Sequence, residues 1–163
     1  MYKLNLDFQN LFIEKSTKSM EKFRNAILFG LSFIWMIPQN LVALVMMPFL
    51  GKLRLISYRN LCFCFEGQNM SGGISLGNFA FVSPYSAKNE AVVAHEQLGH
   101  THDSQLFGPL YLFVIGLPSI LHAWLHTDCP CYYHFFTEKR ANKFAGVEVK
   151  YTSSGRCYLS LKK

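Results

Sequence analysis

The chain has 163 residues, which is enough for a single domain with one hydrophobic core. Half of its residues are hydrophobic and 15% are aromatic, whereas only 16% are charged, against about 25% in typical soluble proteins. The net charge of +6 comes from dispersed lysines and arginines without any nucleic-acid-binding motif, so the composition indicates a membrane partner and no nucleic acid.

The longest apolar segment covers residues 26–50, AILFGLSFIWMIPQNLVALVMMPFL, and contains no charged residue. Because a helix needs about 20 apolar residues to cross a bilayer, we predict a transmembrane segment over residues 25–50. Pro38, Gln39 and Asn40 interrupt its middle, and polar groups are costly against lipid, so a kinked or re-entrant segment is an alternative. We expect the two amides to hold helices together rather than to face a site.

Residues 52–83 contain three short runs of strand-like residues, KLRLISY, LCFCF and ISLGNFAFV, separated by turn-forming residues. This pattern predicts a small antiparallel sheet. Cys62 and Cys64 lie in one run, and with Cys129 and Cys131 they could form a four-thiolate zinc site. Structural zinc sites usually separate paired cysteines by about two to four residues, so we interpret these cysteines as buried thiols.

The segment AVVAHEQLGHTHDSQ, residues 91–105, lies in a helix that we predict over residues 87–106, beginning near Ser86. In zinc hydrolases such a helix provides two histidines four residues apart in the pattern H-E-x-x-H. Here His95 and His100 are five residues apart. At about 100° per residue the two side chains point about 140° apart, so in a regular α-helix they cannot bind the same ion.

A π-bulge at residues 97–99 would absorb the extra residue and bring His95 and His100 together. Such bulges are rare, but they are frequent at functional sites, and glycine at position 99 eases the distortion. This arrangement alone keeps two histidine ligands and leaves Glu96 as the general base of an ordinary hydrolase.

Two other arrangements are open. Glu96 and His100 are four residues apart and could both bind the metal, which would leave Gln97 at the position of the base. His95 and His102 are nearly in line along a helix, but they are about 10 Å apart along its axis, too far for one ion. His102 and the aspartate that follows it are therefore expected to be exposed.

A second uncharged run, LFGPLYLFVIGLPSILHAWLH, covers residues 106–126 and could cross a membrane, although two prolines break it. After a Cys-Pro-Cys turn, YYHFFTEKRANKFAG predicts a further helix that ends at Gly146. The tail VEVKYTSSGRCYLSLKK predicts two short strands around a Ser-Ser-Gly turn.

This further helix carries the third candidate ligand, in TEKRANKFA, residues 137–145. Glu138 would project from it, and Asn142, one turn later, could hold a neighbouring side chain by a hydrogen bond, as residues that orient metal ligands do. Zinc hydrolysis needs three protein ligands, an open position for water and a carboxylate that accepts the proton of the water.

HEQLGH together with TEKRANKFA resembles the two halves of the gluzincin metallopeptidases, especially membrane-embedded ones of the CAAX-processing and stress-protease type. IWMIPQNLVAL, GGISLG, GHTHDSQLFGPLYLFVIGLPS and YYHFFTEKRANKFAGV are together similar to a group of small membrane proteins of gut Bacteroidetes. That group has HExGH at its first site and TEKxADKxGGV at its second. The similarity covers residues 33–147, and the chain differs by one residue inserted between Glu96 and Gly99 and by Asn142 in place of aspartate.

The resemblance implies zinc as the cofactor. It implies His95, His100 and Glu138 as the metal ligands and Glu96 as the general base. Asn142 would support a ligating histidine, less strongly than the aspartate of the pattern because an amide carries no charge.

For the whole chain we predict a single membrane-associated α+β domain, residues 1–163, with a small antiparallel sheet. Residues 87–146 would hold the gluzincin-like His-Glu helix, the apolar helical segment and the glutamate helix. The expected function is that of a membrane-embedded zinc metallopeptidase-like protein, which hydrolyses a peptide bond near the bilayer. The expected location is the bacterial inner membrane. Its partners would be lipid and a peptide or membrane-protein substrate. The alternatives are a catalytically degenerate pseudo-peptidase with a binding role and a metal-free membrane protein with a structural role.

Overall fold

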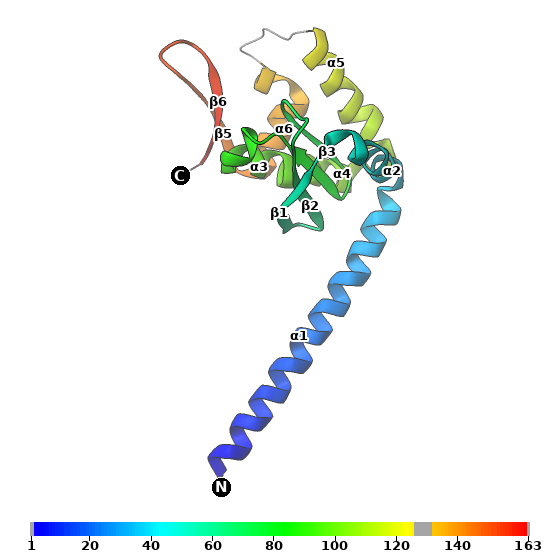
Figure 1. The fold of residues 1–163 in the computed structure, drawn as a ribbon, viewed down its shortest axis with the longest axis vertical. Helices are drawn as coiled ribbons and strands as arrows, with labels where there is room; N and C mark the ends of the chain where they lie inside the picture. Colours follow the sequence, from blue (N-terminus) through cyan, green and yellow to red (C-terminus); the bar gives the residue numbers. More distant parts are fainter. Residues whose placement is uncertain (1, 126–131, 163) are drawn as a thin grey trace.

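The computed structural model describes residues 2–125 and 132–162, with side chains from Thr17 onwards, and it has the predicted α+β fold. Helix α1 (Tyr2–Trp35) projects from a body of short helices around a sheet, and its N-terminal end lies far from that body (Figure 1). The candidate site lies within the body. Cys129 and Cys131 fall outside the described residues.

The predicted segment over residues 25–50 is not one continuous helix. It breaks at Met36, after which α2 (Ile37–Met46) and the short η1 (Met47–Leu50) follow at an angle of 91° to α1. Pro38 stands in the first turn of α2, where its missing N–H costs least, whereas in a continuous helix it would break the hydrogen bonding. The kinked alternative is therefore the one that the backbone adopts.

The two amides at this break hold helices together, as expected. Gln39 is buried, and its Nε2 donates to the Gly108 carbonyl oxygen at 2.9 Å. Asn40 is also buried, and its Nδ2 donates to Asn78 Oδ1 while its own Oδ1 accepts from the Asn78 backbone N–H, both at 2.8 Å. These bonds fix α2 against the sheet and against the segment that follows the His-Glu helix.

The main sheet has four strands in the order β1-β2-β4-β3. The strands are β1 (Leu53–Arg59), β2 (Cys62–Gly67), β3 (Gly73–Leu76) and β4 (Phe79–Val82). The predicted antiparallel sheet is wrong in one respect, because β2 and β4 pair in parallel and the sheet is mixed. All four residues of β4, FAFV, are buried, and a strand covered on both faces belongs in the interior of a sheet rather than at its edge.

The predicted thiols of β2 are buried, as expected. Cys62 and Cys64 are both free, and neither is accessible to solvent. They pack against Val82 and Val93 in a core between the sheet and the helix that follows it. Burial raises the pKa of each thiol to about 12, which keeps both of them protonated and apolar.

The predicted helix over residues 87–106 is divided into segments. A 3₁₀ turn, η2 (Ser86–Lys88), comes first, and then α3 (Glu90–Ala94), the π-helix η3 (His95–His100) and α4 (Thr101–Phe107) run on from one another. The start expected near Ser86 is wrong, since Asn89 is the N-cap and its side chain accepts the Ala91 N–H at 3.0 Å. Ser86 instead bonds Ser83, with 2.9 Å between the two hydroxyl oxygens.

The second apolar run is also bent. The chain turns through η4 (Gly108–Leu110) into η5 (Leu112–Gly116) and α5 (Leu117–Leu125), at an angle of 118° to the His-Glu helix. The two bends touch, because Trp35 Nε1 donates to the Gln105 carbonyl at 2.8 Å. A Cβ on Gly108 would lie 2.3 Å from the Trp35 ring, and its φ of +50° also favours glycine. In the described part of the chain, no single helix is long and apolar enough to cross a membrane, although each bent pair passes that test as a pair.

The C-terminal elements are those predicted. After η6 (Tyr132–His134), α6 (Phe136–Ala145) ends at Gly146 in the left-handed conformation, with φ of +66°. Strands β5 (Val147–Tyr151) and β6 (Cys157–Leu161) then form an antiparallel hairpin. Figure 1 shows this hairpin on the side of the body away from α2, with α6 beside the sheet.

Candidate metal centre

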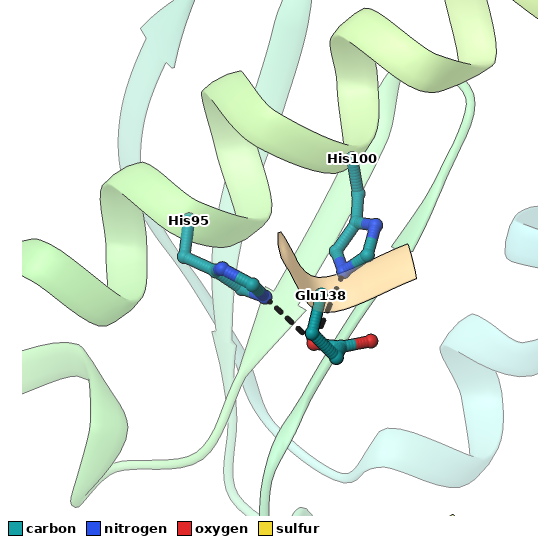
Figure 2. A group of neighbouring side chains, drawn as sticks. All are labelled: His95, His100 and Glu138. Carbon is teal, nitrogen blue, oxygen red and sulfur yellow. Dashed lines mark hydrogen bonds and ion pairs between the residues drawn. The ribbon is translucent and has the colours of Figure 1, made fainter. Parts of the chain in front are cut away.

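The His-Glu helix has the π-helical arrangement among the three considered from sequence. In a π-helix the hydrogen bonds join residue i to residue i+5, so two residues five apart lie one turn apart on the same face. His95 and His100 are the first and last residues of η3, and their ring centroids are 4.8 Å apart. Figure 2 shows both imidazoles on the same side of the helix.

Glu138 approaches the two histidines from α6. Its Oε2 lies 3.1 Å from His95 Nε2 and 3.6 Å from His100 Nε2, and one ligand atom from each of the three residues lies within 4.8 Å of the others (Figure 2). The exposed fractions of His95, His100 and Glu138 are 2%, 6% and 1%. The three residues therefore form a buried cluster that could hold a metal ion.

Gly99 lets α6 come close enough to deliver Glu138. A Cβ at this position would lie 2.4 Å from the Ala141 carbonyl oxygen and 2.8 Å from its carbonyl carbon. Any larger residue would push the backbone of α6 away from η3. The glycine thus serves the close packing of two helices as well as the π-helical turn.

An ion pair that the sequence did not predict also joins the two helices. Asp103, expected to be exposed, is fully buried, and its Oδ1 accepts from Arg140 Nη2 at 2.9 Å and from Arg140 Nε at 3.2 Å. The Arg140 guanidinium also lies over the Phe107 and Phe144 rings, at 5.2 and 5.7 Å from their centroids. The aspartate and its partner are 37 residues apart in the sequence, so no local pattern indicates the contact, and only the packing of α4 on α6 reveals it.

Asn142 orients His95. Its Oδ1 lies 2.8 Å from His95 Nδ1, and its Nδ2 donates to the Tyr133 carbonyl at 3.4 Å. Because the amide nitrogen is directed to that carbonyl, the oxygen faces His95 and accepts its Nδ1–H. This directs Nε2 toward Glu138 and the centre of the cluster, where it can donate to the carboxylate when protonated or bind a metal when not.

Opposite charges stabilise the cluster in the absence of a metal. Burial by itself raises the pKa of the Glu138 carboxyl, but hydrogen bonds and charges from His100 and His95 hold it well below its usual range. Burial lowers the pKa of His100, but the hydrogen bond and charge of Glu138, with Glu96 and Asp103, raise it to about 9. The space between His95, His100 and Glu138 therefore favours a positive charge, which either a proton on a histidine or a metal ion can provide.

Glu96 lies beside the cluster rather than in it. Ser75 Oγ lies 2.6 Å from the Glu96 carboxylate oxygen Oε2 and 2.9 Å from the Glu96 carbonyl oxygen. A Cβ at Gly73 would lie 2.3 Å from Glu96 Oε1, so any side chain at this position would displace the carboxylate. Sequence reasoning missed both β3 residues as parts of the site, because their contact with Glu96 depends on where the strand is placed.

Gln97 and His102 both point away from the cluster. Gln97 Nε2 donates to the Cys62 carbonyl at 2.9 Å, and its Oε1 accepts from Ser57 Oγ at 2.7 Å, so it ties η3 to the sheet. The His102 ring stacks on Phe144 at 3.7 Å between centroids. Gln97 is therefore not in the position of a base, which excludes the arrangement with Glu96 and His100 as ligands. His102 is not in the position of a ligand, which excludes the arrangement with His95 and His102.

Two cavities adjoin the centre. The first, of about 310 Å³, is bordered by β3, the η5–α5 segment, Glu96 and His100. The second, of about 520 Å³, is bordered by the start of β3, the β6 strand, His95, Glu96 and Glu138. Glu96 borders both, so its carboxylate is next to open space large enough for a substrate.

Comparison of the chain with protein-family models, with curated proteins and with solved structures finds no match.

Proposed function

We propose that this protein is a zinc metallopeptidase-like hydrolase that cleaves a polypeptide at a membrane. The observation that supports this most directly is the separation of two groups of side chains. His95, His100 and Glu138 converge as one donor set, while the Glu96 carboxylate lies outside that set and borders both cavities. Three donors and one separate carboxylate are the groups that zinc hydrolysis requires.

The donor set is suited to zinc. Two imidazole nitrogens and one carboxylate oxygen are the protein ligands of many catalytic zinc sites, which keep a fourth position for water. Asn142 holds His95 in the tautomer whose Nε2 can bind a metal. His100 Nδ1 has no hydrogen-bond partner among the described residues, so His100 relies on Glu138 and on packing for its orientation.

A zinc ion bound there would polarise a substrate carbonyl and lower the pKa of water. In this proposal Glu96 accepts the proton of the attacking water and returns it to the leaving amine. Ser75 and Gly73 keep the Glu96 carboxylate at the border of the cavities, since the first donates a hydrogen bond to it and the second leaves room for it.

The outer edge of β3, the last strand of the main sheet, supports a polypeptide substrate. The Ser83 N–H donates to the Gly72 carbonyl, and in an antiparallel ladder such bonds alternate, so the backbone groups of Gly73 and Ser75 face the outer edge. The Tyr111 hydroxyl donates to the Ser75 carbonyl at 2.9 Å, which agrees with that assignment. An extended chain could pair with the remaining groups of this edge.

Exposed apolar side chains support the membrane location. They lie on the second half of α1, on α2 with η1, and on the segment from η5 through α5, and we call this surface the apolar face. Its most exposed members are Met20, Phe23, Leu31, Ile34, Val45, Phe49, Phe113, Trp124 and Leu125. A surface with this many large apolar groups is costly in water, so we propose that it is inserted in lipid, in a bacterial inner membrane.

The test is cleavage of a peptide by the full chain, purified in detergent without chelators and loaded with zinc. Glu96→Gln should lower the cleavage rate by about 10²–10⁴-fold, the usual contribution of a general base, with an unchanged zinc content. His102→Ala is the matched control and should keep both the rate and the metal, because His102 only stacks on Phe144. Equal rates in the two variants would remove Glu96 as the base.

A metal-free structural role is the second candidate, because the cluster is already paired internally. Glu138 contacts both histidines, and such a buried pair could tie α6 to η3 without any ion. A metal-to-protein ratio near zero after purification without chelators, and after addition of zinc, would favour this role over both hydrolase and metal-binding pseudo-peptidase. A bound zinc with no cleavage would favour the pseudo-peptidase.

A further inference from the structure

The two cavities border successive parts of the segment that leads into β3 and forms it. The first is bordered by residues 73–76, and the second by residues 71–73. Gly73 borders both, and it is the residue whose missing side chain leaves room for Glu96. The centre therefore lies in the middle of a groove, with open space on either side of it along the strand.

The two arms of this groove differ in chemistry. The arm toward Leu76, here called the apolar arm, is bordered mainly by aliphatic side chains, namely Ile74, Leu76, Leu112, Leu117 and Ile120. The arm toward Ser71, here called the polar arm, is bordered by hydroxyl and amide groups, namely Ser71, Tyr85, Ser86, Asn89 and Tyr158. One end of the groove thus suits an apolar side chain and the other a polar one.

The apolar arm also adjoins the apolar face. Leu117 and Ile120 border this arm, yet about half of each side chain is exposed on the surface of α5. A chain that leaves a lipid environment beside α5 would reach the apolar arm first, then the centre, then the polar arm. This order matches a segment in which an apolar stretch gives way to polar residues.

We infer that the groove takes an internal, extended segment of a polypeptide, with a bulky apolar side chain in the apolar arm and a polar flank in the polar arm. The inference rests on the proposed function and names its substrate class. Apart from Glu96 and the three residues of the metal cluster, the described side chains that border either arm are apolar or neutral. They match the uncharged middle of a chain rather than a charged terminus.

Binding tests the inference without cleavage. The zinc-loaded full chain carrying Glu96→Gln is titrated with a fluorescent peptide that is leucine-rich in one half and rich in serine and asparagine in the other. The peptide with acetylated and amidated ends should bind as tightly as the same peptide with free ends. Replacing its leucines by serine should weaken binding about tenfold or more, because each buried leucine contributes strongly to affinity.

A variant that fills the apolar arm gives the matched comparison. Gly116 borders this arm, and a Cβ there would meet no atom closer than 3.7 Å, so Gly116→Leu can place its side chain in the cavity. It should weaken binding of the leucine-rich peptide about tenfold, with unchanged zinc content and unfolding temperature. Gly30→Leu, at a helix position with no atom within 4 Å, should leave the affinity unchanged.

The outcomes separate this inference from the proposed function. The zinc-loaded wild type should cut the blocked peptide into two internal fragments, identified by mass spectrometry. Release of single residues from a free end, with the blocked peptide inert, would overturn the inference while the protein remains a peptidase. Binding with the expected preference but no cleavage would support the groove and reject the peptidase. Equal affinity for the leucine-rich and serine-substituted peptides would overturn the inference.

Discussion

Asn142 contacts His95 through a neutral amide at a position where an aspartate would add a negative charge. The amide accepts the Nδ1–H of His95 and so fixes which nitrogen faces the centre, but it does little to raise the basicity of the ring. The charge that favours a cation comes instead from Glu138 and, at a greater distance, from Glu96 and Asp103.

Removing the amide should therefore weaken metal binding without emptying the site. For Asn142→Ala we expect the zinc dissociation constant to rise about 10–100-fold, and for Asn142→Asp we expect it to fall, because a carboxylate makes the bonded imidazole a better ligand. Competition with a fluorescent chelator measures both values. Asn69→Ala, on the exposed loop after β2, is the control and should match the wild type. An alanine variant with unchanged affinity would show that Asn142 does not orient His95.

The charge pair in the metal-free centre predicts a pH dependence. Glu138 has a pKa below its ordinary 4.5 in the folded state, so its contribution to stability is present above that value and is lost as the pH falls. His100 has a pKa raised from 6.5 to about 9, so its contribution is present below 6.5 and is lost as the pH rises through about 9. With the metal removed by a chelator, the free energy of unfolding should therefore fall by up to about 3 kcal/mol as the pH rises from 6.5 to about 9.

Denaturant unfolding at a series of pH values checks this expectation. His100→Gln keeps a donor near Glu138 but cannot titrate, so its stability should stay level over the same interval. A wild-type chain whose stability is constant or rises from neutral to alkaline pH would contradict the assigned charge pair.

At the scale of elements, the site depends on one π-helical turn and on the helix that packs against it. The extra residue of HEQLGH is absorbed in η3, which turns His95 and His100 to one side. Gly99 then allows α6 to approach, and the Arg140–Asp103 ion pair holds the two helices together. The ligand set is thus a property of the η3–α6 contact rather than of either helix alone.

A methyl group at this contact should separate the two helices. Gly99→Ala places a Cβ within 2.4 Å of the Ala141 carbonyl oxygen, so α6 must shift and carry Glu138 with it. We expect a loss of about 1–3 kcal/mol of stability, the usual cost of overpacking, and at least a tenfold loss of zinc affinity. Chemical denaturation and metal competition measure the two effects.

Gly30→Ala is the matched control, since a Cβ at this position in α1 meets no atom within 4 Å. It should leave zinc affinity unchanged and stability equal or slightly higher, as alanine favours a helix. A Gly99→Ala variant that behaves like this control would show that the close approach of the two helices is not needed.

For the whole molecule, the two bent helix pairs place the apolar face next to the groove. They touch at their bends through Trp35 and Gln39, and this leaves α2 and α5 on the surface. The arrangement combines a buried, charged centre with an exposed apolar surface. In our proposal the membrane therefore presents the substrate as well as holding the protein.

Charged residues on the apolar face should weaken membrane binding. Phe113→Asp with Trp124→Asp removes two side chains that are 71% and 75% exposed, and we expect the partition of the full chain into anionic vesicles to fall about tenfold or more. Flotation of the protein with vesicles measures this. Tyr85→Asp, at a side chain that is 87% exposed beside the polar arm, should float as the wild type does. Equal flotation of all three proteins would argue against the apolar face as the lipid contact.

Local patterns in the sequence determined the parts of this protein whose structure depends on neighbouring residues. The helix break at Met36 just before Pro38, the helix end at Gly146 and the C-terminal hairpin follow from backbone preferences, which act over a few residues. The spacing of HEQLGH showed that His95 and His100 can bind the same ion in a π-helical turn but not in a regular α-helix, because helix geometry fixes the direction of each side chain. Glu138 and Asn142 were identified by motif, and their distance from His95 could not be read from the sequence.

Only the tertiary structure decided which distant elements meet. The parallel pairing of β2 and β4 depends on the burial of FAFV on both faces, and the contact of Ser75 with Glu96 follows from the resulting place of β3. The buried Asp103–Arg140 pair and the groove along β3 have the same origin. Such contacts join residues far apart in the chain. Their free energy comes from packing and desolvation, which depend on the tertiary arrangement and cannot be predicted from a local sequence pattern.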